Sequence, residues 1–77
     1  MKIQVFAMLK DYFEKEFFLP GKVSNIASLK ARLVEHNPAA AGVLDICRFA
    51  VNDEFIDNNY QFSENDTICI LPPASGG

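Results

Sequence analysis

The chain has 77 residues, which is enough for one small domain. Hydrophobic residues make up 49% of the sequence and charged residues 22%, a balance that excludes a disordered tail. The net charge of −3 argues against nucleic-acid binding, because phosphates require a basic face. No apolar run approaches the roughly 20 residues of a membrane span, and the N-terminus does not have the organisation of a signal peptide. We therefore expect a cytoplasmic protein without a membrane partner. Cys47 and Cys69 are too few for a disulfide scaffold or a zinc site, and we expect no metal.

The N-terminal segment predicts a β-strand over residues 2–9, followed by a second strand over residues 16–19. Alternation gives the first strand a core face with Ile3, Val5, Ala7 and Leu9, and another face with Gln4, Phe6 and Met8. Because Phe6 and Met8 are unusually apolar for a solvated face, they indicate a second packing layer or a partner surface, and we favour the partner surface. The charged residues 10–16 suit an exposed connection, and Pro20-Gly21 marks a turn. The two strands should form an antiparallel hairpin with a long loop.

A helix follows the hairpin. Ser24 and Asn25 are both good N-caps, and Asn25 stands directly before the apolar stripe. The stripe consists of Ile26, Leu29 and Leu33. Pro38 should stop the helix near Asn37. Residues 39–44 should be irregular or a short helical turn, and His36 is interpreted as a favourable charge at the helix end rather than a catalytic or metal-binding group.

Three more strands complete the pattern, over residues 48–51, 54–56 and 67–71. Asn52 and Asp53 tolerate positive φ and predict a tight hairpin turn between the first two. Residues 60–62 should pack a connection across the sheet, and residues 63–66 form a turn. In the last strand Ile68 and Ile70 are the core candidates, and Cys69 on the other face is interpreted as a small apolar filler rather than a nucleophile.

This order of elements predicts an α+β fold. A hairpin followed by a helical crossover gives a mixed sheet of about five strands with one main helix on one face. The simplest closure places the first and last strands side by side and parallel in the centre, which is the β-grasp arrangement of ubiquitin. We therefore expect a β-grasp domain over residues 1–71 and a flexible tail over residues 72–77.

The residue types change directly after the last predicted strand, where the tail begins. Pro72 and Pro73 cannot donate ladder hydrogen bonds, and four small residues without a charged side chain follow them. Small residues at a terminus often have no function. Here, however, the tail follows a strand that we expect in the centre of the sheet. This arrangement indicates a domain whose C-terminal carboxylate is presented to another protein.

Three stretches resemble a known family. They are Val-Asn-Asp-Glu-Phe at residues 51–55, Glu-Asn-Asp at residues 64–66, and Leu-Pro-Pro-Ala-Ser-Gly-Gly at residues 71–77. They look like the small, sulfur-carrying subunit of molybdopterin synthase, and the resemblance covers the whole length. Glycine is usual in the family where this sequence has Asp53 and Asn65, but both residues tolerate left-handed geometry. Arginine is usual where Lys10 stands, which leaves a salt-bridge role for Lys10 open.

The resemblance implies a carrier cycle. An activating enzyme uses ATP to adenylate the Gly77 carboxylate, and a sulfur donor then converts it to a thiocarboxylate. The sulfur passes to a cyclic pyranopterin phosphate in the active site of the large subunit, within a heterotetramer. This chain would bind no cofactor and would not be catalytic alone. The part of the tail that enters the large subunit comprises Pro73, Ala74, Ser75 and Gly76.

The partner surface is expected on the sheet face opposite the helix. It comprises Phe6, Met8, Lys10, Cys69, Leu71 and Pro72. Leu71 has two interpretations of equal weight, as a partner contact or as a cap on the core. A thiazole-pathway sulfur carrier and a ubiquitin-like modifier remain alternatives, because both share the fold and the Gly-Gly end. An independent small enzyme is disfavoured, because no second nucleophile, base or metal cluster accompanies His36.

Overall fold

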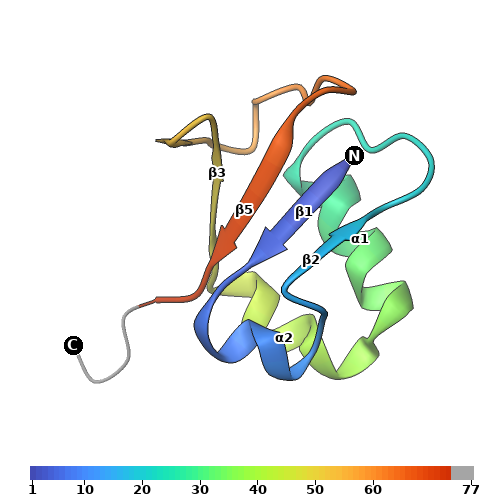
Figure 1. The fold of residues 1–77 in the computed structure, drawn as a ribbon, viewed down its shortest axis with the longest axis vertical. Helices are drawn as coiled ribbons and strands as arrows, with labels where there is room; N and C mark the ends of the chain where they lie inside the picture. Colours follow the sequence, from blue (N-terminus) through green and yellow to red (C-terminus); the bar gives the residue numbers. More distant parts are fainter. Residues whose placement is uncertain (74–77) are drawn as a thin grey trace.

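The computed structural model describes residues 1–73, which form one mixed five-stranded sheet with a helical layer on one face (Figure 1). The strand order is β2-β1-β5-β3-β4. The strands are β1 (Lys2–Val5), β2 (Glu16–Phe18), β3 (Arg48–Val51), β4 (Glu54–Phe55) and β5 (Thr67–Leu71). The helices are α1 (Ile26–His36), α2 (Ala41–Asp45) and the 3₁₀ turns η1 (Ala7–Asp11) and η2 (Pro38–Ala40). The first and last strands are parallel neighbours in the middle of the sheet, so the predicted β-grasp fold is confirmed.

The predicted first strand is too long. β1 ends at Val5, and the chain turns at Ala7, whose φ is +53°. The turn continues into η1, where the Leu9 amide donates to the carbonyl of Phe6 at 3.1 Å. Leu9 is fully buried from this turn, whereas Ala7 is exposed. Leu9 can be buried whether residues 6–9 continue the strand or form a turn. The alternation of apolar residues therefore could not distinguish the two here.

Both predicted hairpins are confirmed. β1 and β2 pair antiparallel, with Ile3 opposite Phe17. β3 and β4 pair antiparallel around Asn52 and Asp53, whose φ values are +53° and +66°. Two positive φ angles match the right-handed twist of a two-residue hairpin, which is why Asn and Asp are suited to it. β4 ends at Phe55, one residue earlier than predicted.

The helix α1 begins and ends where the sequence indicated. The Asn25 side chain accepts a hydrogen bond from the Ser28 amide at 3.0 Å, and the Ser28 hydroxyl accepts one from the Asn25 amide at 3.1 Å. This reciprocal pair satisfies backbone donors that the first turn leaves free. The helix ends at His36 and is capped by Asn37, directly before Pro38, and the chain then continues through η2 and α2. The stretch after Pro38 is therefore helical rather than irregular.

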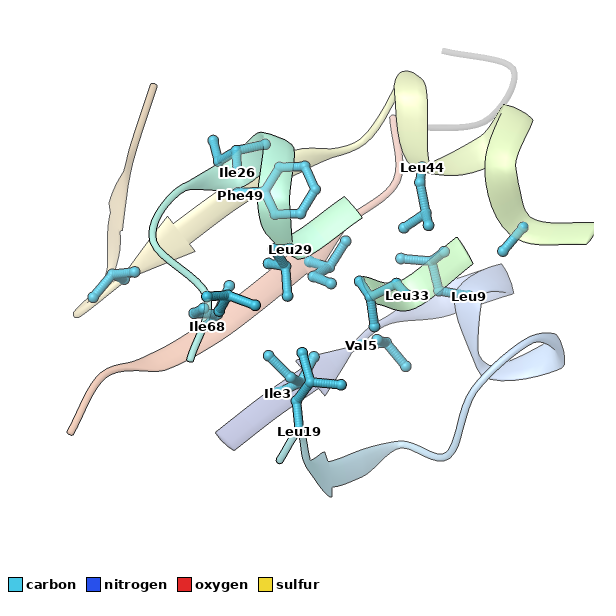
Figure 2. Close-up of a cluster of buried hydrophobic side chains, with 14 residues drawn as sticks. Ile3, Val5, Leu9, Leu19, Ile26, Leu29, Leu33, Leu44, Phe49 and Ile68 are labelled. Carbon is cyan, nitrogen blue, oxygen red and sulfur yellow. The ribbon is translucent and has the colours of Figure 1, made fainter. Parts of the chain in front are cut away.

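The core lies between α1 and the sheet. Figure 2 shows side chains from the helix and from the strands converging on one apolar layer. Ile3, Leu29, Leu33, Ile68 and Ile70 are each fully buried. Within residues 1–73 no charged or polar residue is buried. Burial of each such side chain is worth about 1.5–3 kcal/mol relative to exposure, so these residues hold β5 firmly beneath the helix.

None of the helices in residues 1–73 combines the length and the apolarity that a membrane span requires.

Candidate functional site

β5 carries the chain from the core to the C-terminal tail. It is paired on both sides, parallel to β1 and antiparallel to β3, and it ends at Leu71 opposite Arg48. The chain then leaves the end of the sheet through Pro72, which is half-buried, and Pro73, which is exposed (Figure 1). Strand pairing on both sides holds β5 as far as Ile70, and Leu71 is paired with Arg48 on one side. The tail therefore starts at the end of a strand that is anchored in the centre of the sheet.

An apolar hollow of about 250 Å³ opens on the outer face of the sheet, away from α1. It is lined by Phe6, Ala50, Asp53, Phe55, Cys69 and Leu71. Strand register explains it, because Ala50 lies opposite both Cys69 and Phe55, and residues directly opposite each other share a face. The small side chain of Ala50 leaves space between its larger neighbours. The wall residues Phe6 and Phe55 are 41% and 57% exposed.

Arg48 extends the rim of the hollow. The carbon of its guanidinium group lies 3.8 Å from the centroid of the Phe55 ring, which is a cation–π contact. Since Arg48 also lies opposite Leu71, a fixed positive charge stands beside the residue from which the tail departs. Asp53 lines the hollow with a negative charge. The hollow is therefore apolar inside and carries both signs of charge around it.

The structure brings together only part of the predicted partner surface. Phe6, Cys69 and Leu71 line the hollow, and Pro72 follows directly. Met8 and Lys10 lie on η1 and do not line it, because the chain leaves the sheet after Val5. The prediction that Met8 shares a sheet face with Phe6 is therefore wrong, because Met8 lies on η1 and not on a strand. Met8 and Lys10 are both exposed.

Phe55, Ala50 and Arg48 were not identified from the sequence as site residues. The Asn52-Asp53 turn could have indicated them. A two-residue turn fixes the register of the hairpin, and this register places Ala50 opposite Phe55. An apolar residue on a solvent-facing strand of only two residues then indicates a contact surface rather than core.

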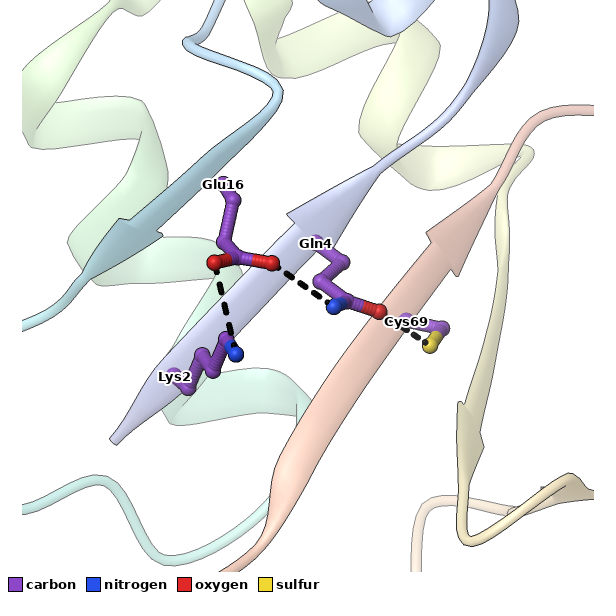
Figure 3. A network of polar contacts seen from close by, with 4 residues as sticks. All are labelled: Lys2, Gln4, Glu16 and Cys69. Atoms are coloured by element: carbon purple, nitrogen blue, oxygen red, sulfur yellow. Dashed lines mark hydrogen bonds and ion pairs between the residues drawn. The ribbon is translucent and has the colours of Figure 1, made fainter.

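A polar strip crosses the same outer face beside the hollow (Figure 3). Glu16 accepts a hydrogen bond from the Gln4 amide at 2.8 Å and pairs with Lys2 at 3.3 Å. These contacts, the Gln4 hydrogen bond first, hold the pKa of Glu16 below its usual value. The Cys69 thiol donates to the Gln4 carbonyl oxygen at 3.4 Å.

The chemistry available within residues 1–73 is limited. Burial raises the pKa of the Cys69 thiol, and the charge of Asp53 raises it further. Burial also raises the pKa of Cys47, although Lys30 opposes the effect. A thiol that resists ionisation is a poor nucleophile, which favours a packing role for both cysteines. No three His, Cys, Asp or Glu side chains in the described part of the chain are grouped as metal ligands.

The remaining predicted site residues, Ala74, Ser75, Gly76 and Gly77, lie outside the described residues. The structure describes the chain that precedes them, in which Leu71 is paired with Arg48 and Pro73 is exposed.

Comparison with known proteins extends this picture. The model of the ThiS family matches residues 3–77. The molybdopterin synthase sulfur carrier subunit of Dictyostelium discoideum is 35% identical over 81 residues, which cover 99% of this chain and 94% of that protein. The protein of the same name from Chlamydomonas reinhardtii is 27% identical, covering 100% of this chain and 98% of its own length.

Two solved structures are also similar. One belongs to the protein–protein complex of subunits 1 and 2 of molybdopterin-converting factor from Helicobacter pylori 26695, with 30% identity and a TM-score of 0.70 over 99% of this chain and 96% of that one. The other is SAMP1 from Haloferax volcanii, with a TM-score of 0.79 over 99% of this chain and 97% of that one. At 20% identity the latter shows the shared fold alone. The chain thus belongs to the ThiS family, as a relative of molybdopterin synthase sulfur carrier subunits.

Proposed function

We propose that this chain is the sulfur carrier subunit of a molybdopterin synthase and that its Gly77 carboxylate carries the sulfur. The observation that carries the proposal is the anchored strand β5, which ends at Leu71 and leads directly into the Pro-Pro-Ala-Ser-Gly-Gly ending. The full-length similarity to two proteins named as such carriers supports it.

The proposed chemistry takes place at the tail. The Gly77 carboxylate attacks the α-phosphate of ATP in an activating enzyme, and pyrophosphate leaves. Sulfide then attacks the acyl carbon of this mixed anhydride and displaces AMP, which leaves a thiocarboxylate. In the large subunit this sulfur bonds to a carbon of a cyclic pyranopterin phosphate, and water then cleaves the acyl–sulfur bond. The sulfur stays on the pterin and the Gly77 carboxylate is restored. Activated acyl intermediates of this kind divide one difficult step into two easier ones.

The tail has the properties that such a cycle requires. Gly76 and Gly77 have no Cβ, so a narrow channel can close on the backbone and a nucleophile can reach the carbonyl. Residues 72–77 span at most about 20 Å when extended, at about 3.3–3.6 Å a residue. Pro72 and Pro73 reduce the conformational entropy that is lost when the tail enters a pocket.

The hollow around Leu71 is the proposed contact with the large subunit. Its wall is formed by Phe6, Phe55 and Leu71, which surround the point where the tail leaves the sheet. Aromatic side chains at such a position are typical of the buried centre of an interface. One similar chain was solved in a complex of two molybdopterin-converting factor subunits, which supports a two-subunit assembly for this chain.

The general acid–base groups, the nucleotide site and the pterin site are assigned to the partners. The raised pKa values of both cysteines support this division, because these thiols are poorly suited to accept or pass on sulfur. In this scheme the chain supplies the reacting atom and the surfaces that position it.

Intact mass spectrometry after incubation with ATP, an activating enzyme and sulfide tests the proposal. We expect a mass gain of one sulfur-for-oxygen exchange, located at Gly77 by fragmentation. The loaded chain should then form a stable complex with a molybdopterin synthase large subunit and convert cyclic pyranopterin phosphate. Loading without complex formation would favour a thiazole-pathway carrier, and attachment to lysines of other proteins would favour a modifier. Absence of the sulfur-for-oxygen exchange contradicts both sulfur-carrier functions.

A further inference from the structure

The strand β2 is an edge of the sheet, next to β1 only (Figure 1). The Val5 amide donates to the Lys15 carbonyl at 3.0 Å, and the Leu19 amide donates to the Met1 carbonyl at 2.8 Å. In an antiparallel pair, hydrogen-bonded and non-hydrogen-bonded positions alternate. The backbone of Phe17 therefore faces β1, and the amides and carbonyls of Glu16 and Phe18 point away from the sheet. This edge offers two donors and two acceptors in the geometry of a strand.

The edge lacks the usual protection against strand addition. Natural edges are commonly protected by proline or by charged side chains. β2 contains no proline, and its single charge belongs to Glu16. Figure 3 shows that this carboxylate is turned over the sheet, where it contacts Gln4 at 2.8 Å and Lys2 at 3.3 Å. Phe18 is 75% exposed and is the most exposed of the large apolar side chains in the described residues.

A groove of about 410 Å³ runs beside this edge, between β2 and the end of α1. Phe13 and Phe17 form its aromatic wall, with stacked rings whose centroids lie 5.9 Å apart. The Asn37 side chain donates to the carbonyl of Tyr12 at 3.0 Å, which ties this wall to the end of α1. The volume is at the lower end of the range for ligand pockets, about 300–1,000 Å³, and suits one large apolar side chain. Glu14 provides the only acidic side chain in its lining.

We propose that the β2 edge and this aromatic groove bind an extended segment of a partner protein, which adds a sixth strand antiparallel to β2. The free backbone groups of Glu16 and Phe18 require an extended polypeptide as the occupant. The guest residue opposite Phe17 faces the groove and is a large aliphatic residue. The residue opposite Glu16 faces the outer side and is basic, in keeping with the carboxylate of Glu16. The residue opposite Phe18 is β-branched, because such side chains pair well with aromatic ones across strands.

This site is distinct from the hollow around Leu71. β2 forms one edge of the sheet, whereas Phe55 lies on β4 at the opposite edge. A partner segment on β2 can therefore hold the carrier while its tail and its hollow engage a second protein. The site thus provides a tether that does not compete with the tail.

The test is a titration of the full, nitrogen-15-labelled chain with the acetylated and amidated pentapeptide Thr-Val-Ile-Lys-Thr, followed by NMR. In the proposed register its Val, Ile and Lys lie opposite Phe18, Phe17 and Glu16. We expect saturable shifts of the amides of Glu16 and Phe18 and of the groove residues Phe13 and His36. A matched peptide with methylated Val and Lys amide nitrogens lacks the two donors that β2 accepts, and it should cause none of these shifts.

Two protein variants sharpen the test. Phe18→Ser should weaken peptide binding about fivefold, the scale of one cross-strand aromatic pair. Phe55→Ser removes an exposed phenylalanine at the opposite edge and should leave binding unchanged. Phe18→Ser should also accept sulfur on Gly77 as the parent does, so this outcome is independent of the carrier function. Absence of saturable shifts, equal shifts with the methylated peptide, or shifts confined to the hollow around Leu71 would each overturn the proposal.

Discussion

Arg48 and Phe55 join the two strands of the second hairpin through their side chains, with the guanidinium carbon 3.8 Å from the ring centroid. The contact holds the Phe55 ring at the wall of the hollow, beside the residue from which the tail leaves. It also keeps a positive charge at the rim without an acidic partner within ion-pair distance in the described residues. The pair thus links the stability of the hairpin to the shape of the proposed contact surface.

A double-mutant cycle measures this link. Urea unfolding of the parent, Arg48→Gln, Phe55→Leu and the double variant should give a coupling free energy of about 0.5–1 kcal/mol, as expected for an exposed cation–π pair. The control cycle combines Arg48→Gln with Phe18→Leu, whose side chain lies at the opposite edge of the sheet, and its coupling should be near zero. Equal coupling in both cycles would show that the contact has no specific energy.

Leu71 should contribute more to partner binding than to folding. It is half-buried at the hollow, while its neighbour Ile70 is fully buried in the core. Leu71→Glu should weaken binding of the large subunit about tenfold or more, because a charge would be buried in an apolar contact. Thr67→Glu places the same charge on the same face at the start of β5 and should leave the affinity within about twofold of the parent. Calorimetric affinity and melting temperature are measured together, and an unfolded Leu71→Glu protein would assign Leu71 to the core.

Much of the fold followed from local signals. Ile68 and Ile70 are in the core because alternation in a short strand allows only one buried face. Asn52 and Asp53 form the hairpin turn because both tolerate positive φ. Asn25 caps α1 because it directly precedes the apolar stripe. In each case the residue type and its position were sufficient.

Other features depended on contacts that the sequence does not express. Ala7 adopts φ +53° although alanine has no preference for it. We attribute this to Leu9, which is completely buried once the chain turns. The hollow arises from Ala50 between Cys69 and Phe55, which becomes visible only when three strands are in register. The aromatic groove beside β2 likewise requires α1 to end next to the hairpin.

The cap of α1 provides a simple stability test. Asn25→Ala removes the side-chain acceptor of the Ser28 amide and should lower the free energy of unfolding by about 1 kcal/mol. Ser24 and Asn25 are both good N-cap residues, and only Asn25 stands directly before the apolar stripe. The structure assigns the capping bond to Asn25. Ser24→Ala should therefore change stability by less than about 0.5 kcal/mol. Urea denaturation of both variants measures these changes in the free energy of unfolding. An equal loss in both variants would contradict the assignment of the cap to Asn25.

The cysteines predict how stability changes at alkaline pH. Burial raises the pKa of both thiols above the ordinary value of 9.0, so the folded state holds these protons more tightly than the unfolded state. Their contribution is fully present below the ordinary pKa and is lost as the pH rises through the raised values. The parent should lose more stability between pH about 7 and about 10 than the Cys47→Ala, Cys69→Ala double variant. Tyr60, whose pKa is raised mainly by burial, is present in both proteins, so the difference isolates the thiols.

The same double variant separates the cysteines from the carrier chemistry. If sulfur travels on Gly77, the variant should still be loaded and should still support product formation. A stability loss of about 1 kcal/mol is expected from the half-buried positions. Intact mass after loading is the measurement, and failure to load in a folded protein would indicate that a cysteine carries the sulfur.

The terminal glycines provide the most direct test of the tail. Deletion of Gly77 leaves a carboxylate on Gly76, displaced by about 3.5 Å in an extended chain. Such a displacement should abolish transfer, since a misplacement of about 1 Å can cost about a hundredfold in rate. Gly77→Ala keeps the reach but adds a methyl group beside the reacting carbonyl, so it should be impaired less completely. Neither change alters the sheet or α1, and both variants should melt as the parent does. Product formation is measured with the large subunit and loaded carrier, with folding checked on the same samples. A deleted protein that accepts and passes on sulfur at the parental rate would show that Gly77 is not the carrier.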